Sequence, residues 1–316
     1  MTKNCRPAKK GIFLATVRAN KQIGQRFYRL RLEFSGVGAE AFAGAKPGQF
    51  AQLDLSRTAL PAAKDIPDEL ANTARRNILL RRPFSFANIA SEENKTLADI
   101  LYCVVGPASL RMTTLSAGDS VSIIGPLGNG FLVPEGKKKA LLVAGGMGAG
   151  PLQHLAKVLT ADYPDIEVMA FAGAKTAKDL PFQARLDKIA QQLGFSLQEF
   201  AQYGIESLVA TDDGSAGWHG LVSDCLAEWL DQATLVSKDT IIYSCGPEAM
   251  LAKVADIARK NEIDCQVSME RMMACGIGVC LSCAVECKAD RPGKTVYKLC
   301  CKDGPVFDSR EVVFSV

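Results

Sequence analysis

The period of the hydrophobic pattern changes partway along this 316-residue chain, and that change limits its possible folds. Residues 11–133 alternate apolar and polar positions between Gly and Pro turns. The alternating segments are GIFLATVRA, RFYRLRLEF, GQFAQLDL, DILYCVVG and DSVSIIGPLG. A period of two in short segments is typical of antiparallel strands with one buried face. We therefore expect residues 1–136 to form a small β-barrel domain.

Residues 137–267 instead alternate buried strands with amphipathic helices. KALLVAGGMG, IEVMAFAGA, FSLQEFA and TIIYSCGPE are predicted strands, and PLQHLAKVLTAD, PFQARLDKIAQQLG and EAMLAKVADIARKN are predicted helices. This order indicates an α/β domain with a doubly wound parallel sheet. Residues 268–316, short and rich in Cys, are predicted to form a third, small domain. Residues 56–77 interrupt the barrel pattern as an inserted loop with one helical turn, for which the sequence indicates no function.

Charge and hydropathy exclude two classes of partner. The formal net charge of +3 is too small to favour nucleic acid or an anionic membrane surface. No apolar run approaches the roughly 20 residues that span a bilayer. The basic start, MTKNCRPAKKGIFLATVRAN, leads into an apolar patch that Arg18 interrupts. We expect a short basic tail and a first strand there rather than a signal peptide, and hence a cytoplasmic protein.

Two segments indicate a nucleotide site. In LLVAGGMGAGPLQHLAKV, a strand is followed by a glycine turn with Gly146 and Gly148, and Pro151 stands in the first helical turn. The amide groups of such a helix start can bind a pyrophosphate, although a plain tight turn has the same pattern. In IIYSCGPEAMLAKV, Cys245 and Gly246 end a buried strand, where parallel sheets bind ligands. A Gly-Pro cap beside a core cysteine is the competing interpretation.

The barrel region carries a candidate anion site in LLRRPFSFANI. Its two adjacent arginines, with Pro83 and Ser85, suggest contact with an anion, whereas a solvated basic strand end is the simpler interpretation. The segments VVGPASLRM and GDSVSIIGPLGNGF add Gly-rich turns that can bring backbone N–H groups to phosphates.

Cysteines cluster at the end of the chain, where six of the eleven follow residue 274. The spacing Cys275-x4-Cys280-x2-Cys283 with a more distant cysteine is typical of plant-type [2Fe-2S] sites. A structural zinc site is the alternative, built from Cys280, Cys283, Cys300 or Cys301 and one further thiolate. The two histidines, His154 and His219, are expected to be helix-surface or turn residues rather than ligands.

Taken together, these segments resemble the ferredoxin–NADP reductase superfamily, and within it the electron-transfer subunits of class B dihydroorotate dehydrogenases. The most specific matching segments are RRPFS, GPLGNGF, LVAGGMGAGPL, TDDGSAGWHGLVSD, CGPEAML, ERMMACGIGVCLSC and CKDGPVF. The chain departs from the family pattern in the 56–77 insertion and in Cys287, a rival ligand between Cys283 and Cys301.

The resemblance implies a role for each matching residue. Those that would bind FAD are Arg82, Pro83, Phe84, Ser85, Val104, Val105, Gly106, Ala108 and Ser109. Gly146, Gly148, Pro151, Cys245 and Gly246 would bind NAD. Ala108 and Ser109 replace a Gly-Thr pair of the family. The implied [2Fe-2S] ligands are Cys275, Cys280, Cys283 and Cys301, the last chosen over Cys300 because it directly precedes KDGPVF.

The resemblance also implies an electron relay in pyrimidine biosynthesis. A partner catalytic subunit with FMN would oxidise dihydroorotate, and electrons would pass through the [2Fe-2S] cluster and FAD to NAD+ within a heterotetramer. No residue of this chain is then expected to do acid–base catalysis. Two alternatives stay open. One is a subunit of a sulfide dehydrogenase-type or ferredoxin-linked NAD(P)H reductase, and the other is a nucleotide-binding module with a structural zinc.

Overall fold

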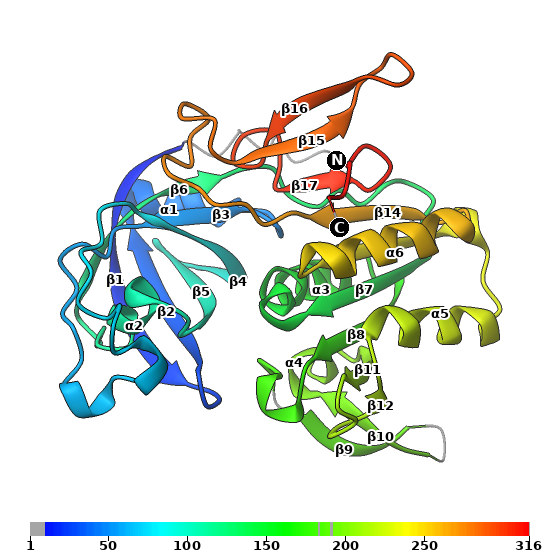
Figure 1. Ribbon diagram of the computed structural model, residues 1–316, viewed down its shortest axis with the longest axis horizontal. Coiled ribbons are helices and arrows are strands. Elements are labelled where there is room, and N and C mark those ends of the chain that lie inside the picture. Colours follow the sequence, from blue (N-terminus) through cyan, green and yellow to red (C-terminus); the bar gives the residue numbers. More distant parts are fainter. Residues whose placement is uncertain (1–9, 183, 190–191, 316) are drawn as a thin grey trace.

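The computed structural model describes residues 10–182, 184–189 and 192–315. Its first part is a closed six-stranded barrel, in the order β1-β2-β5-β4-β3-β6, which confirms the predicted β-barrel (Figure 1). Alternate residues, such as Ala51 and Leu53 of β3, fill the barrel interior because successive side chains point to opposite faces of a strand. The barrel elements are β1 (Gly11–Gln22), β2 (Phe27–Ser35), α1 (Gly36–Ala43), β3 (Phe50–Leu53), β4 (Arg82–Glu92), β5 (Lys95–Cys103), α2 (Pro107–Met112) and β6 (Ser120–Leu127).

The inserted segment, residues 56–77, lies between β3 and β4. It contains two short 3-10 turns, η1 (Ala63–Asp65) and η2 (Asp68–Leu70), rather than the single helical turn predicted. Leu70 and Ala74 are buried in the barrel core, so the segment is packed against the barrel.

A seven-stranded sheet follows, in the order β12-β11-β8-β7-β13-β14-β17. It is parallel except for β17, which runs antiparallel to β14. Helices α5 and α6 pack on one face of the sheet, and α3 packs on the other. The order reverses between β7 and β13, so this doubly wound sheet has its switch point there. The elements are β7 (Lys139–Gly145), η3 (Gly146–Gly148), α3 (Ala149–Asp162), β8 (Glu167–Ala174), η4 (Ala177–Asp179), β11 (Glu206–Thr211), β12 (Trp218–His219), α5 (Val222–Gln232), η5 (Ser237–Asp239), β13 (Thr240–Cys245), α6 (Glu248–Lys260) and β14 (Asp264–Ser268).

The helix predicted over PFQARLDKIAQQLG is wrong. The structure has an antiparallel hairpin there, β9 (Ala184–Ile189) and β10 (Gln192–Leu197), and FSLQEFA divides between β10 and a short helix, α4 (Gln198–Ala201). Helix propensity is a weak prior that tertiary context overrides. Strand pairing supplies the backbone hydrogen bonds of this segment instead.

The C-terminal region interlocks with the other two parts. A hairpin of β15 (Ala284–Lys288) and β16 (Thr295–Leu299) projects from it, and β17 (Val306–Asp308) completes the large sheet (Figure 1). The side chain of Asn129, just after the barrel, donates to the carbonyls of Asp303 and Val306 and accepts from the Val306 N–H. The predicted boundary at residue 268 thus crosses many contacts. No helix among the described residues is long and apolar enough to cross a bilayer.

Candidate functional site

The predicted flavin motif lies at the start of β4, beside β3. Pro83 stands opposite Gln52, Phe84 opposite Ala51 and Ser85 opposite Phe50. Residues 82–85 are all half-buried, so each retains surface that a ligand can contact. Phe84 turns towards the barrel core, where its ring meets Tyr102 edge-on with centroids 6.4 Å apart.

The two adjacent arginines have different environments. Arg81 donates to the carbonyl and hydroxyl of Ser122 at 2.8 and 2.9 Å and lies 3.5 Å from an Asp54 carboxylate oxygen. Arg82 donates only to the carbonyls of Leu80 and Arg81, its own neighbours in the chain. Arg81 is therefore engaged in the barrel, whereas the guanidinium of Arg82 has no carboxylate partner among the described residues and is suited to an anion.

The run from Val104 to Ser109 forms a turn and the start of α2. Val104 is buried and Val105 is exposed. The buried hydroxyl of Ser109 accepts from the N–H groups of Val105 and Gly106, at 3.0 and 3.2 Å. This hydroxyl holds the turn in place, a role that the resemblance did not assign to it. Ala108, also buried, occupies the same first turn.

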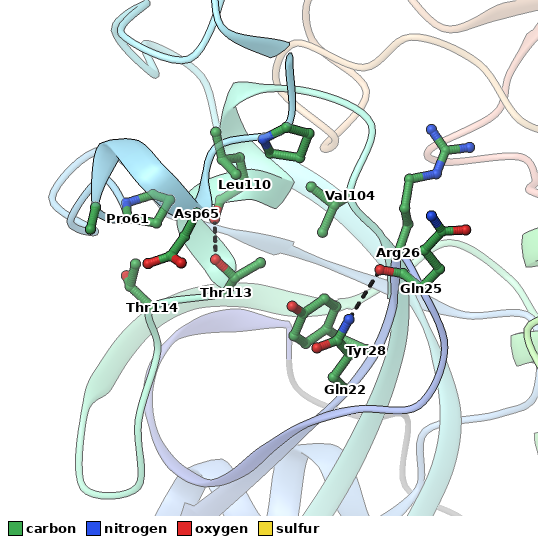
Figure 2. A pocket seen from close by; sticks show the side chains of 12 residues that line it. Gln22, Gln25, Arg26, Tyr28, Pro61, Asp65, Val104, Leu110, Thr113 and Thr114 are labelled. Atoms are coloured by element: carbon green, nitrogen blue, oxygen red, sulfur yellow. Dashed lines mark hydrogen bonds between the residues drawn. The ribbon is translucent and has the colours of Figure 1, made fainter. Parts of the chain in front are cut away.

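A cavity of about 540 Å³ opens beside this turn (Figure 2). Its wall includes Val104, Leu110 and Tyr28 from the barrel, and Pro61 and Asp65 from the inserted segment. The volume is within the range of sites that bind small molecules. Val104 of this wall belongs to the sequence-predicted flavin residues, and a cavity of this size can hold part of a flavin dinucleotide.

The two nucleotide turns are in direct contact at the switch point of the sheet. A Cβ at Gly148 would lie 1.9 Å from the carbonyl oxygen of Cys245, and one at Gly246 would lie 3.0 Å from the backbone of Gly145. Only glycine permits this approach. Pro151 lies in the first turn of α3, as predicted, and burial raises the pKa of Cys245 to about 12, which keeps its thiol neutral.

The nucleotide turn also adjoins the flavin strands. A Cβ at Gly150 would contact Leu101 of β5 at 3.6 Å and Ala87 of β4 at 3.9 Å. Further along α3, the Lys157 ammonium donates to the side chain of Asn88 and the carbonyl of Ile89, each at 2.7 Å. Helix α3, which carries Pro151, therefore packs against β4, the strand that begins with the predicted flavin motif.

The cysteine loop surrounds the sulfur of Cys275 with donors. The N–H groups of Ile277, Val279 and Cys280 lie 3.4–3.5 Å from this sulfur. These bonds, that of Ile277 first, lower the pKa of Cys275. The hydroxyl of Ser282, 3.2 Å from the Cys280 sulfur, is the main cause that lowers the pKa of Cys280 to about 6. Thiolates are the form that binds metal.

The thiols form two interacting pairs. Cys275 and Cys280 interact with each other, and Cys301 interacts with Cys283, whose sulfur also accepts the Cys301 N–H at 3.4 Å. Among the described residues, no three His, Cys, Asp or Glu side chains converge as one metal ion requires. In a [2Fe-2S] cluster each iron takes two protein ligands, so paired thiols with N–H donors fit that group better than zinc.

The two rival cysteines have other surroundings. The Cys300 thiol donates to the Met269 carbonyl at 3.2 Å, and burial raises its pKa to about 12. Cys287 lies within β15. Burial raises its pKa, and the charged groups that affect it are Lys298, Glu311 and Asp303. Burial raises the pKa of Cys301 to about 12 as well, but of these three described thiols Cys301 is the one that Cys275 also influences across the loop.

One residue that the sequence did not single out connects the loop with the flavin strands. Gln52 is fully buried, and neither atom of its carboxamide has a hydrogen-bond partner among the described residues. It stands opposite Pro83, and a Cβ at Gly276 would lie 2.4 Å from its Nε2 atom. No local sequence signal marks it, because both contacts join distant segments.

The histidines lie away from the cysteine loop, on α3 and β12. His154 is buried in α3, so the prediction of a helix-surface position is wrong for it. Its neighbours Gln153 and Lys157 on the same helix contact the barrel. His219 is exposed on β12.

Comparison with protein families identifies two regions of the chain. Residues 270–313 match the iron-sulfur cluster binding domain of dihydroorotate dehydrogenase B, and residues 142–256 match the oxidoreductase NAD-binding domain.

Known proteins match over almost the whole length. The electron transfer subunit of dihydroorotate dehydrogenase B (NAD(+)) from Caldanaerobacter subterraneus subsp. tengcongensis is 33% identical, over 95% of this chain and 98% of the relative. That of Bacillus caldolyticus is 34% identical, over 94% and 97%.

Solved structures share the fold. An NADH-dependent reduced ferredoxin–NADP oxidoreductase has a TM-score of 0.71 at 24% identity, with 95% of this chain and 90% of the other covered. The cytochrome b5 reductase domain of Ulva prolifera nitrate reductase has a TM-score of 0.57 at 17% identity, with 82% and 95% covered. The sequence relatives show the family, and the barrel, the sheet and the cysteine loop agree with it. The chain belongs to the family of electron transfer subunits of dihydroorotate dehydrogenase B.

Proposed function

We propose that this chain passes electrons from an FMN-containing dihydroorotate dehydrogenase catalytic subunit through a [2Fe-2S] cluster and FAD to NAD+, in pyrimidine biosynthesis. A flavin exchanges hydrides with nicotinamides and single electrons with iron-sulfur clusters, so it belongs between the other two groups. The observation that carries the proposal is the continuous contact from the cysteine loop through Gln52 to the flavin strands, and from those strands to the nucleotide turns.

The residues of the chain would hold and orient these groups. Arg82, Pro83, Phe84, Ser85, Val104, Val105, Gly106, Ala108 and Ser109 are proposed for FAD, and Gly146, Gly148, Pro151, Cys245 and Gly246 for NAD. Cys275, Cys280, Cys283 and Cys301 are the proposed cluster ligands. Backbone N–H groups around the sulfurs stabilise their negative charge, and the packed glycine turns exclude water. No side chain is proposed to move a proton.

A partner subunit is supported by the surface of the cysteine loop. Four apolar side chains there are between 51% and 89% exposed, namely Met272, Ile277, Val279 and Leu281. Exposed apolar groups gathered on one loop are typical of a protein interface. We propose that the FMN subunit covers them in a heterotetramer. The thiol-rich loop requires reduced cysteines, which favours a cytoplasmic location.

The test begins with the visible spectrum and acid-labile sulfide content of protein purified anaerobically. Flavin bands together with broad iron-sulfur absorption are expected, and a colourless protein containing zinc would contradict the proposal. The protein is then mixed with the FMN subunit and assayed for reduction of NAD+ by dihydroorotate. Cofactors without this activity would favour a ferredoxin-linked NAD(P)H reductase, the class to which a solved structure with the same fold belongs.

A further inference from the structure

The inserted segment, residues 56–77, is attached to the barrel by specific contacts. Leu70 and Ala74 pack into the barrel core. From α2, the Arg111 guanidinium donates to the Ala74 carbonyl at 2.7 Å, and beyond α2 the Thr114 hydroxyl, which also reaches the Arg111 carbonyl, lies 3.2 Å from the Ala59 carbonyl. The segment is therefore a fixed wall beside α2 rather than a free loop.

This wall faces the 540 Å³ cavity beside Val104 (Figure 2). Pro61 and Pro67 from the segment, with Leu110 and Val104 from the barrel, give it apolar surfaces. Asp65 adds a carboxylate. Flat aromatic bases bind between such apolar surfaces, and a carboxylate can accept a hydrogen bond from an amino group or a ribose hydroxyl.

Barrel residues on the opposite side supply the remaining groups. Tyr28 contributes a ring that stacks on Tyr102 with centroids 5.3 Å apart, and Arg26 contributes a cation. The side chain of Arg26 is 43% exposed, and its nearest carboxylate is that of Glu69, 3.7 Å away. A cavity that combines apolar surfaces, a carboxylate and a cation matches a purine nucleoside phosphate.

We propose that the inserted segment and the barrel wall hold the adenosine phosphate half of FAD, so that this segment selects FAD over FMN. The inference rests on the proposed function, in which the chain binds a flavin. Val104 lines the cavity and is also one of the residues proposed to bind FAD. If the flavin ring lies along those residues, the adenosine half of FAD extends into the cavity beside the inserted segment. FMN lacks the adenosine half and makes none of these contacts.

The experiment titrates the full chain, freed of flavin, with FAD and with FMN separately and follows flavin fluorescence. Asp65→Ala and Arg26→Ala are expected to raise the Kd for FAD about tenfold and to leave the Kd for FMN unchanged, since each removes a hydrogen bond that is strengthened by a charge. Asp68→Ala is the matched control, because Asp68 is exposed on the same segment but does not line the cavity.

Two results would overturn the inference. One is an equal change in Kd for FAD and FMN, and the other is FAD binding that neither variant alters. A wild-type chain that binds neither flavin would overturn the proposed function as well, so the two failures are distinguishable. Circular dichroism of each variant shows whether it is folded.

A second inference comes from the buried carboxamide of Gln52. A buried amide without a hydrogen bond destabilises a folded protein, so its retention indicates a partner outside the described residues. The Nε2 atom lies against Gly276, the residue directly after Cys275. We propose that Gln52 donates a hydrogen bond to a sulfur of the iron-sulfur group held by the loop. This inference also rests on the proposed function.

Gln52→Leu tests this role, because leucine keeps most of the volume and removes the donor. Donors to sulfur favour the reduced cluster. The variant is expected to lower the reduced-to-oxidised ratio of the cluster at a set potential by up to tenfold, about 59 mV for one electron. The electron paramagnetic resonance spectrum should change with it. In the cluster-free chain, where the amide has no partner, leucine should raise the stability.

Gln153→Leu is the matched control, since Gln153 is equally buried but accepts from Arg29 at the contact between α3 and the barrel. Its cluster potential and spectrum should equal those of the wild type. An unchanged potential and spectrum in Gln52→Leu would overturn the inference. Wild-type protein without any cluster would overturn the proposed function too.

Discussion

Gly276 lies so close to the side chain of Gln52 that any Cβ at position 276 would require one of the two to shift. A Cβ there would lie 2.4 Å from the Nε2 atom of Gln52, and the backbone of Gly276 has a φ of +70°. This contact fastens the cysteine loop to β3, the strand that pairs with the flavin motif. The position of the loop thus depends on a glycine in two ways, steric and conformational.

Gly276→Ala should lower the free energy of unfolding by about 1–3 kcal/mol, because the left-handed backbone and the steric clash both oppose it. Gly293→Ala is the matched control, since its φ is +73° but no atom lies within 4 Å of the added Cβ. It measures the conformational cost alone. In a double variant with Gly276→Ala, Gln52→Ala should remove the steric part of the lost stability and leave the conformational part. Urea denaturation of the four proteins checks this, and equal effects at 276 and 293 would contradict it.

Replacing cysteines one at a time should separate the ligands from their rivals. Cys301→Ser is expected to abolish the iron-sulfur absorption, because the Cys301 thiol interacts with Cys283 beside the loop. Cys300→Ser should retain it, since that thiol donates to Met269 instead. Iron content and the visible spectrum are the measurements. Loss of the cluster in Cys300→Ser with retention in Cys301→Ser would reverse the assignment.

The two adjacent arginines should respond differently to truncation. Arg82→Ala is expected to weaken FAD binding tenfold to a hundredfold with little change in stability, because its hydrogen bonds are only to Leu80 and Arg81. Arg81→Ala should instead lower the unfolding midpoint, since it loses Ser122 and Asp54. Flavin titration and thermal unfolding of the flavin-free variants check both. Equal flavin affinity in the two variants would contradict the distinction.

Buried His154 should make the protein sensitive to acid. Burial, together with the nearby Lys157 charge, lowers its pKa from the ordinary 6.5 to about 3, and its Nδ1 atom has no partner among the described residues. At a pH between these two pKa values, His154 binds a proton in the unfolded chain but not in the folded chain. The free energy of unfolding therefore falls as the pH falls below about 6.5.

His154→Leu should therefore reduce the stability lost between pH 7 and pH 5 by about 2 kcal/mol. Urea denaturation at a series of pH values measures this difference. If the free energy of unfolding falls equally with pH in the wild type and in His154→Leu, a group other than His154 causes the acid sensitivity.

The sequence by itself determined the two large architectures and the cysteine loop. Alternation over the first residues of Ser120–Leu127 encodes one buried face, and continuous burial along Lys139–Gly145 encodes a strand covered on both sides. These are local properties, visible in any short window. The spacing of Cys275, Cys280 and Cys283 is also local, because one tight loop contains all three.

Tertiary structure decided which of these segments meet. The hairpin at 184–197 replaced a predicted helix because strand pairing outweighed weak local preference. The contacts of Gln52 with Gly276 and of Gly148 with Cys245 join positions far apart in the chain, as does the hydrogen bond from the Cys301 N–H to the Cys283 sulfur. Such pairs follow from barrel closure, sheet order and the return of β17 to the sheet, and no window of sequence contains both members.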